Sequence, residues 1–253
     1  MAPLILLTND DGVYAPGIRA LAKEVAGLGE VFLVAPDREV SACSQSLTLT
    51  HPLRAEQIEP GTYAVDGTSA DCVNLALVKL LPGKPTLLIS GINRGPNLGE
   101  DIFYSGTVGA AREGSFFGIP SIAVSLTVKA DGDFGPAAVF ARRLAALVLT
   151  NSLPPRTLLN VNVPAGEPRG VAITVQGTRE HQGTVLEGLD PRRRTYYWIE
   201  EGRGRWVNDE MSDIHAVRRG LISVTPLHTD TTHHNVVGQL KGWEPALRSG
   251  DDS

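Results

Sequence analysis

The chain has 253 residues, of which 20% are charged and 42% hydrophobic, and its formal net charge is −5. This is the composition of a folded domain, and the acidic balance argues against a nucleic-acid polymer as partner, because phosphate backbones are bound by clustered Lys and Arg. The sequence contains neither a secretory signal nor the roughly 18 to 20 continuous apolar residues of a membrane span, so we expect a cytoplasmic protein with no membrane partner. Its two cysteines, Cys43 and Cys72, do not have the spacing of a disulfide framework or a zinc site.

The first structured stretch ends at two adjacent acids. Residues 4–7 are an unbroken apolar run, which is typical of a strand buried on both faces of a parallel sheet, and Asp10 and Asp11 follow it closely. Ligands of open α/β sheets bind beyond the carboxyl ends of the strands, and paired carboxylates suit a hard divalent cation such as Mg²⁺. Two interpretations are open: a metal site, or an Asp-Asp-Gly turn that ends the strand.

A helix and a second strand should follow. The apolar spacing of residues 18–28 predicts a helix that begins near Pro16, and residues 31–35 predict a buried parallel strand. If this strand neighbours the first, a hydroxyl of the next loop, such as that of Ser41, can reach the same ion. The other serines of the loop, Ser44 and Ser46, favour local turns.

Residues 47–50 and 63–65 alternate as strands do and predict a hairpin-like excursion. Thr68 or Ser69 should cap a helix over residues 72–81, with Asp71 as a capping acid in its first turn. Residues 86–90 then predict another buried strand.

The loop that follows residue 90 is long and rich in Gly and Asn, a composition that frees backbone amides for binding. It ends at Ser105, Gly106 and Thr107, where a helix of small residues begins. The N-terminus of a helix attracts anions, so a phosphate fits there, although Ser105 or Thr107 could instead simply cap the helix.

The remaining chain continues the alternation of strands and helices before the pattern loosens. We expect strands at 120–126, 158–163, 171–175 and 220–225, and helices at 134–149 and 210–219. This order predicts a Rossmann-like core over residues 1–175, built as a mostly parallel three-layer α/β/α sandwich, and a C-terminal extension over residues 176–253. Residues 176–211 should contact a second subunit, with the basic run 192–194 in an exposed hairpin turn. No metal role is expected for His233 and His234.

Taken together, five motifs resemble the SurE family of survival-protein nucleotidases and run in the family's order. They are Thr-Asn-Asp-Asp-Gly-Val-Tyr-Ala-Pro-Gly-Ile at 8–18, Val-Ala-Pro-Asp-Arg at 34–38, Ser-Gln-Ser-Leu-Thr at 44–48, Ser-Gly-Ile-Asn-Arg-Gly-Pro-Asn-Leu-Gly-Glu-Asp at 90–101 and Tyr-Ser-Gly-Thr at 104–107. The resemblance implies a metal-dependent phosphatase that releases phosphate from nucleoside monophosphates, with 5′-nucleotidase activity and, in some members, 3′-nucleotidase or polyphosphate-trimming activity. Ser69 stands where many members have proline.

The same resemblance assigns the metal ligands. The ligands of one divalent cation per subunit, Mg²⁺ or Mn²⁺, carry over to Asp10, Asp11, Ser41 and Asn93. We expect metal-activated water to be the nucleophile, with Asn9 orienting water or substrate and either acid accepting the proton. Phosphoryl oxygens should be steadied by Asn97, Ser105, Gly106 and Thr107. A homodimer or homotetramer is expected.

Three other classes of protein compete with this interpretation. A receiver-type signalling domain also has an acid pair but needs a phosphoacceptor Asp after its central strand, where this chain has Ser90-Gly91-Ile92-Asn93. A dinucleotide-binding module would need Gly-x-Gly-x-x-Gly after the first strand, which is absent. A haloacid-dehalogenase-like phosphatase would need Asp-x-Asp and would form a covalent aspartyl-phosphate.

Overall fold

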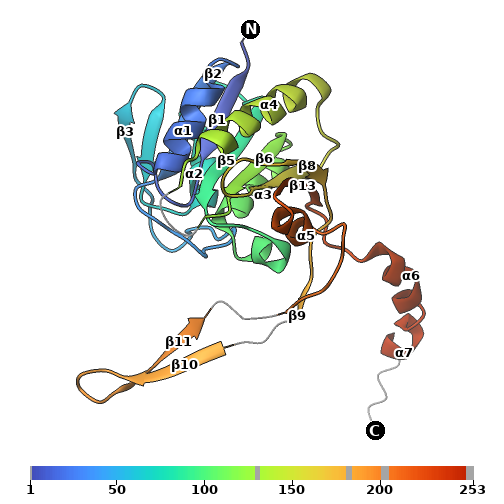
Figure 1. Ribbon diagram of the computed structural model, residues 1–253. Helices are drawn as coiled ribbons and strands as arrows, with labels where there is room; N and C mark the ends of the chain where they lie inside the picture. Colours follow the sequence, from blue (N-terminus) through green and yellow to red (C-terminus); the bar gives the residue numbers. More distant parts are fainter. Residues whose placement is uncertain (1, 129–131, 181–183, 201–204, 249–253) are drawn as a thin grey trace.

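A nine-stranded sheet with helices on both faces forms the centre of the protein (Figure 1). The computed structural model describes residues 2–128, 132–180, 184–200 and 205–248. The strands of the main sheet are β1 (Leu4–Thr8), β2 (Glu30–Pro36), β3 (Ala55–Glu59), β4 (Thr62–Val65), β5 (Leu87–Arg94), β6 (Ser121–Leu126), β7 (Thr157–Val163), β8 (Gly170–Ile173) and β13 (Leu221–His228). The helices are α1 (Pro16–Val25), α2 (Ser69–Leu75), α3 (Gly106–Phe116), α4 (Gly135–Asn151), α5 (Asp213–Arg218), α6 (His234–Lys241) and α7 (Glu244–Arg248), with a π turn (Ala76–Leu80) and a 3₁₀ turn (Gly99–Phe103).

The order of the strands places a binding crevice between β1 and β5. The sheet runs β3-β4-β2-β1-β5-β6-β7-β13-β8, and every neighbouring pair from β4 through β7 is parallel. The chain builds from β1 towards β2 on one side and from β5 towards β6 on the other, so the direction of winding reverses between β1 and β5. In open α/β sheets such a reversal opens a crevice at the carboxyl ends of the strands, where ligands bind.

Alternate residues of the central strands belong to two separate apolar layers. In β1, Ile5 and Leu7 pack on the side of α1 and α4, whereas Leu6 packs on the side of α2 and α3. Each of these side chains is fully buried, as expected for a strand covered on both faces. The predicted mostly parallel three-layer α/β/α architecture is therefore confirmed.

Local signals placed several elements correctly. Pro16 begins α1, and Thr68 caps α2 in a capping box with Asp71. The prediction of a strand at 47–50 is wrong, because residues 47–49 form no regular structure and the hairpin partner of β4 is β3 instead. The Thr48 backbone N–H and hydroxyl both donate to the Asp71 carboxylate, at 2.9 and 2.6 Å, so the segment is fastened by side-chain bonds rather than by a ladder.

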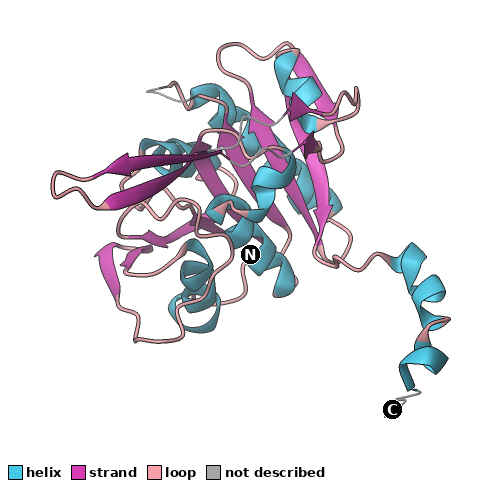
Figure 2. Ribbon diagram, turned by 90° about the horizontal axis from the view of Figure 1, so that it is seen from below, coloured by secondary structure: helices cyan, strands magenta, loops and turns pink. Residues whose placement is uncertain are grey.

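Residues 176–253 contain a hairpin, a short helix and a late strand, and they do not form a separate layer. The late strand β13 lies inside the main sheet, antiparallel to β7 and parallel to β8. The hairpin of β10 (Thr184–Leu189) and β11 (Thr195–Glu200) reaches away from the sheet, as do α6 and α7, which the sequence did not predict (Figures 1 and 2). Residues 181–183, 201–204 and 249–253 of the extension lie outside the described residues.

The basic run 192–194 lies in the connection of this hairpin, as predicted. The short strands β9 (Arg179–Glu180) and β12 (Arg205–Trp206) pair antiparallel to each other. Among the described residues, none of the helices has the length and apolarity needed to cross a membrane.

Candidate functional site

The acid pair lies at the crevice between β1 and β5. These strands are parallel neighbours, with Thr8 opposite Ser90, so the residues that follow Thr8 lie beside the end of β5. The Arg94 backbone N–H donates to Asp11 Oδ2 at 3.2 Å, which joins the end of β5 directly to the acid pair. Asn93, the residue before Arg94, is thereby brought to the same edge as Asp10 and Asp11.

The loop after β2 brings Ser41 to this edge. The Val40 backbone N–H donates to the Asp10 carbonyl at 2.8 Å, which fixes the loop next to the acid pair. The Ser41 hydroxyl donates to Glu39 at 2.8 Å, so its oxygen keeps a free lone pair. The Asn93 side-chain amide donates to the Gly95 carbonyl at 2.9 Å, which leaves its Oδ1 as the free acceptor of that amide.

The turn after β1 is fixed by Asn9 and Gly12. The Asn9 amide donates to the Gly12 carbonyl at 2.9 Å, and Gly12 has a φ of +100°, a conformation that side chains rarely adopt. Asn9 is fully buried, and its Oδ1 has no hydrogen-bond partner among the residues that the structure describes. A buried acceptor without a partner is costly, so this oxygen is available to a ligand or water at the site.

The N-terminus of α3 faces Asp10. The Thr107 hydroxyl bonds to Asp10 Oδ1, and a Cβ added at Gly106 would lie 2.9 Å from Asp10 Oδ2. Burial raises the pKa of Asp10 above its ordinary 3.8, while the bond from Thr107 and the N–H groups of Gly106 and Thr107 oppose this rise. Ser105 caps the helix, since its hydroxyl accepts from the Val108 N–H at 3.1 Å. Ser105 therefore caps the helix, whereas Thr107, in its first turn, positions an acid.

The pKa of Asp11 is raised as well. Burial first, and repulsion from Asp10 second, raise the pKa of Asp11 from 3.8 to about 6. Two desolvated carboxylates side by side are unfavourable unless a proton or a cation relieves them. Among the described residues, no Lys, Arg or His forms a salt bridge with either acid.

Asn97 is held by a buried amide network that the sequence analysis did not identify. Its backbone carbonyl accepts from Asn160 at 2.8 Å and from Asn162 at 3.0 Å, and its side-chain amide donates to Ser125 at 2.8 Å. Asn160 and Asn162 are fully buried on β7. Two asparagines in alternate positions of an otherwise apolar strand were the signal that could have identified this network, because buried amides need partners.

Ser69 also acts here. Its hydroxyl donates to the Gly106 carbonyl at 2.9 Å, which ties the start of α2 to the start of α3. The hydroxyl at this position therefore makes a specific contact that a proline could not make.

The residues of the site fit a divalent cation. Hard cations take carboxylate, hydroxyl and amide oxygens, and Asp10, Asp11, Ser41 and Asn93 offer these from three neighbouring segments. The two acids, which form no salt bridge in the described part of the chain, supply the negative charge that such an ion neutralises. Among the described residues, no group of three or more His, Cys, Asp and Glu side chains could hold a metal ion, so any cation here depends on two acids supplemented by neutral oxygens.

Comparison with known families agrees with this geometry. The model of the family described as survival protein SurE matches residues 5–183. The chain belongs to the SurE family. It is 53% identical over 244 residues to the 5′-nucleotidase SurE of Geotalea uraniireducens, which is 95% of this chain and 98% of that protein. The 5′-nucleotidase SurE of Geotalea daltonii gives the same identity and coverage.

A solved SurE structure shows the same fold. The crystal structure of the SurE protein from Aquifex aeolicus superposes with a TM-score of 0.86 at 44% identity, covering 96% of this chain and 100% of that one. The family membership inferred from the five motifs is thus confirmed, as is the SurE fold.

Proposed function

We propose that this chain is a metal-dependent phosphomonoesterase that hydrolyses nucleoside 5′-monophosphates to nucleoside and phosphate. The observation that carries the proposal is the pair of desolvated acids, Asp10 and Asp11, at the point where the winding of the sheet reverses. The SurE relatives are named 5′-nucleotidases, which supports nucleoside 5′-monophosphates as the substrate class. A 3′-nucleotidase or polyphosphate-trimming activity is a further part of the proposal that the resemblance alone supports.

Asp10, Asp11, Ser41 and Asn93 would hold one divalent cation, Mg²⁺ or Mn²⁺. When bound, such an ion neutralises phosphoryl charge and makes a water molecule nucleophilic near neutral pH. Phosphoryl transfer depends on positioning and on charge stabilisation more than on covalent chemistry by the protein.

The polar groups around the ion would position the substrate. Asn97 is fixed by the β7 amides and by Ser125, and the second N–H of its side-chain amide would donate to a phosphoryl oxygen. Ser105, Gly106 and Thr107 would add donors at the start of α3. Asn9 would orient water or substrate through its unpartnered Oδ1. The proton of the attacking water would pass to Asp10 or Asp11.

A phosphate-release assay tests this function. We expect AMP to be hydrolysed with Mg²⁺ or Mn²⁺ and not after chelation. Asp10→Asn and Asp11→Asn should each lower kcat/KM about a hundredfold or more, because each removes charge where the cation is held. Glu56→Gln, which changes an exposed acid on β3, is the control. Full activity in both aspartate variants would overturn the proposal.

The competing phosphatase mechanism makes a different prediction. A haloacid-dehalogenase-like enzyme forms a covalent aspartyl-phosphate, whereas direct attack by water does not. Rapid acid quenching of a reaction with radiolabelled AMP should leave the protein unlabelled. Label retained on Asp10 or Asp11 would support the covalent mechanism.

The extension supports a homodimer or homotetramer as the functional form. The hairpin of β10 and β11 exposes Val185, Leu186, Tyr197, Trp198 and Ile199. The segment of α6, α7 and the turn between them exposes Val237, Leu240, Trp243 and Leu247. Apolar surface of this extent is typical of protein contacts.

The sequence predicts a cytoplasmic location.

A further inference from the structure

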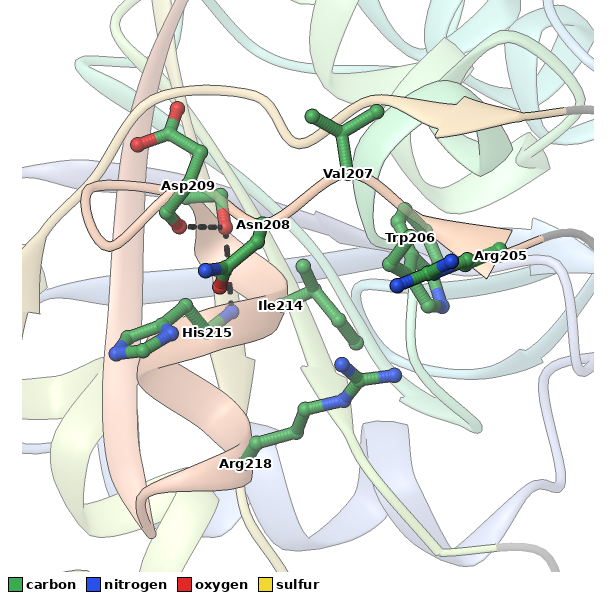
Figure 3. A pocket seen from close by; sticks show the side chains of 9 residues that line it. Arg205, Trp206, Val207, Asn208, Asp209, Ile214, His215 and Arg218 are labelled. Carbon is green, nitrogen blue, oxygen red and sulfur yellow. Dashed lines mark hydrogen bonds between the residues drawn. The ribbon is translucent and has the colours of Figure 1, made fainter.

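A cavity of about 320 Å³ lies between β12 and α5, away from the acid pair (Figure 3). None of the residues proposed to hold the metal ion or the phosphoryl group lines it. Its walls include Arg205, Trp206, Ile214, His215 and Arg218. Two arginines and a histidine in one cavity stand out in a chain whose formal net charge is −5.

The two arginines face a common space. Figure 3 shows the guanidinium groups of Arg205 and Arg218 pointing into the region beside Ile214 and Trp206. Within the described part of the chain, neither arginine forms a salt bridge. Asp209 also lines the cavity, but its carboxylate points away from both arginines in the figure, and its Oδ1 accepts from the Met211 N–H at 2.9 Å. Like charges that share a cavity repel, and an anion between them removes the repulsion.

The walls of the cavity are fixed by contacts from behind. The Arg179 guanidinium lies 4.2 Å from the centre of the Trp206 ring, and a Cβ added at Gly99 would lie 2.5 Å from the edge of that ring. Asp213, the first residue of α5, accepts from the Gly99 N–H at 2.9 Å and the Gly177 N–H at 3.0 Å. A preformed wall lowers the entropic cost of binding, which favours a site over a transient gap.

We propose that this cavity is a second anion site, which takes the phosphate group of a phosphate monoester or free phosphate. Guanidinium groups match phosphate oxygens in geometry and stay charged at any physiological pH. The volume is at the lower end of the range for small-ligand sites and admits a phosphate with part of an organic group beside Trp206. The site is independent of the proposed hydrolysis, since it shares no residue with it.

The test is calorimetric titration of the full chain, treated with EDTA, with inorganic phosphate and separately with AMP in a low-chloride buffer. Arg218→Gln should weaken binding of both probes about tenfold or more, the effect of losing one hydrogen bond between charged groups. Arg218 is exposed, so its replacement should leave the thermal unfolding curve unchanged. Tighter binding of AMP would identify the nucleotide as occupant, and equal affinities would identify inorganic phosphate.

Two matched variants separate this site from other anion binding. Arg219→Gln removes the same charge at the next residue, which is exposed and does not line the cavity, and it should leave affinity unchanged. Asn97→Ala alters the proposed catalytic site and should also leave it unchanged. Three outcomes would each overturn the proposal. They are an equal loss of affinity in Arg219→Gln, a loss of binding in Asn97→Ala but not in Arg218→Gln, and no binding by the wild-type chain.

Discussion

Gly106 lies directly against the Asp10 carboxylate, and this contact sets how closely α3 approaches the acid pair. A Cβ at this position would lie 2.9 Å from Asp10 Oδ2 and 3.0 Å from Cys43 Sγ, too close for either neighbour to stay in place. Gly106→Ala should therefore displace Asp10. Because small errors in the placement of reacting groups are costly, we expect kcat/KM for AMP to fall about tenfold or more.

The control is Gly27→Ala, since an added Cβ there meets no described atom within 4 Å. This variant should keep wild-type kinetics and wild-type thermal stability. Kinetics unchanged in Gly106→Ala would show that Asp10 does not need this placement.

The raised pKa of Asp11 also has a consequence for the stability of the metal-free protein. Between pH 3.8 and about 6 the folded state retains a proton that the unfolded chain releases. The free energy of unfolding should therefore fall as pH rises through this window and level off above it. Asp11→Asn removes this contribution. Urea unfolding of EDTA-treated protein measures the free energy of unfolding at pH 5 and at pH 8. The decrease from pH 5 to pH 8 should be smaller in the variant than in the wild type. Equal decreases would contradict the raised pKa of Asp11.

Single residues at strand ends were the most predictable part of the site. Asp10 and Asp11 follow a buried strand, and the sheet topology alone brings the end of β1 to the end of β5. The amides of Asn160 and Asn162 could not be placed beforehand, because their partner Asn97 is more than sixty residues away in the chain. Contacts of that separation depend on the register of β5, β6 and β7, which local sequence does not fix.

Among the elements, α2 depends most clearly on one side chain. The Asp71 carboxylate accepts from the Thr48 N–H and hydroxyl and from the Thr68 N–H, so it caps the helix and fastens the preceding loop. Asp71→Ala should leave these donors unpaired and lower the free energy of unfolding by about 1 to 3 kcal/mol. Urea unfolding at pH 7 measures this difference. Glu56→Ala, on the exposed side of β3, should change it little, and an equal effect of the two substitutions would refute the capping role.

The same contacts explain why the strand predicted at residues 47–50 is wrong. Alternating Leu and Thr are typical of a strand, but Thr48 bonds to Asp71 and the chain continues to a different partner for β4. Alternating residues show a local preference for β-strand, whereas tertiary hydrogen bonds decide which structure the segment adopts. The strand β13 shows the same limit, since nothing in residues 221–228 indicates that they insert between β7 and β8.

At the scale of the molecule, the insertion of β13 between β7 and β8 joins the C-terminal extension to the core. A boundary at residue 175 separates the chain by pattern, yet β13 completes the sheet of the core. The part of the extension that stands apart is the hairpin of β10 and β11, together with α6 and α7 (Figure 1). Isolated two-stranded hairpins are marginally stable in water, so this one needs a surface to pack on.

A second copy of the chain would provide that surface. Trp198 and Ile199 are 65% and 86% exposed on β11. They point to opposite faces of the hairpin, so a partner buries both only where it covers the two faces. Size-exclusion chromatography with light scattering should give the mass of two or four 27.0 kDa chains for the wild type. Trp198→Ser combined with Ile199→Ser should shift this mass towards one chain, because buried apolar area drives the association. Ile173→Ser, which changes a 72% exposed side chain on β8, should not, and an unchanged mass in the hairpin variant would exclude the hairpin as the subunit contact.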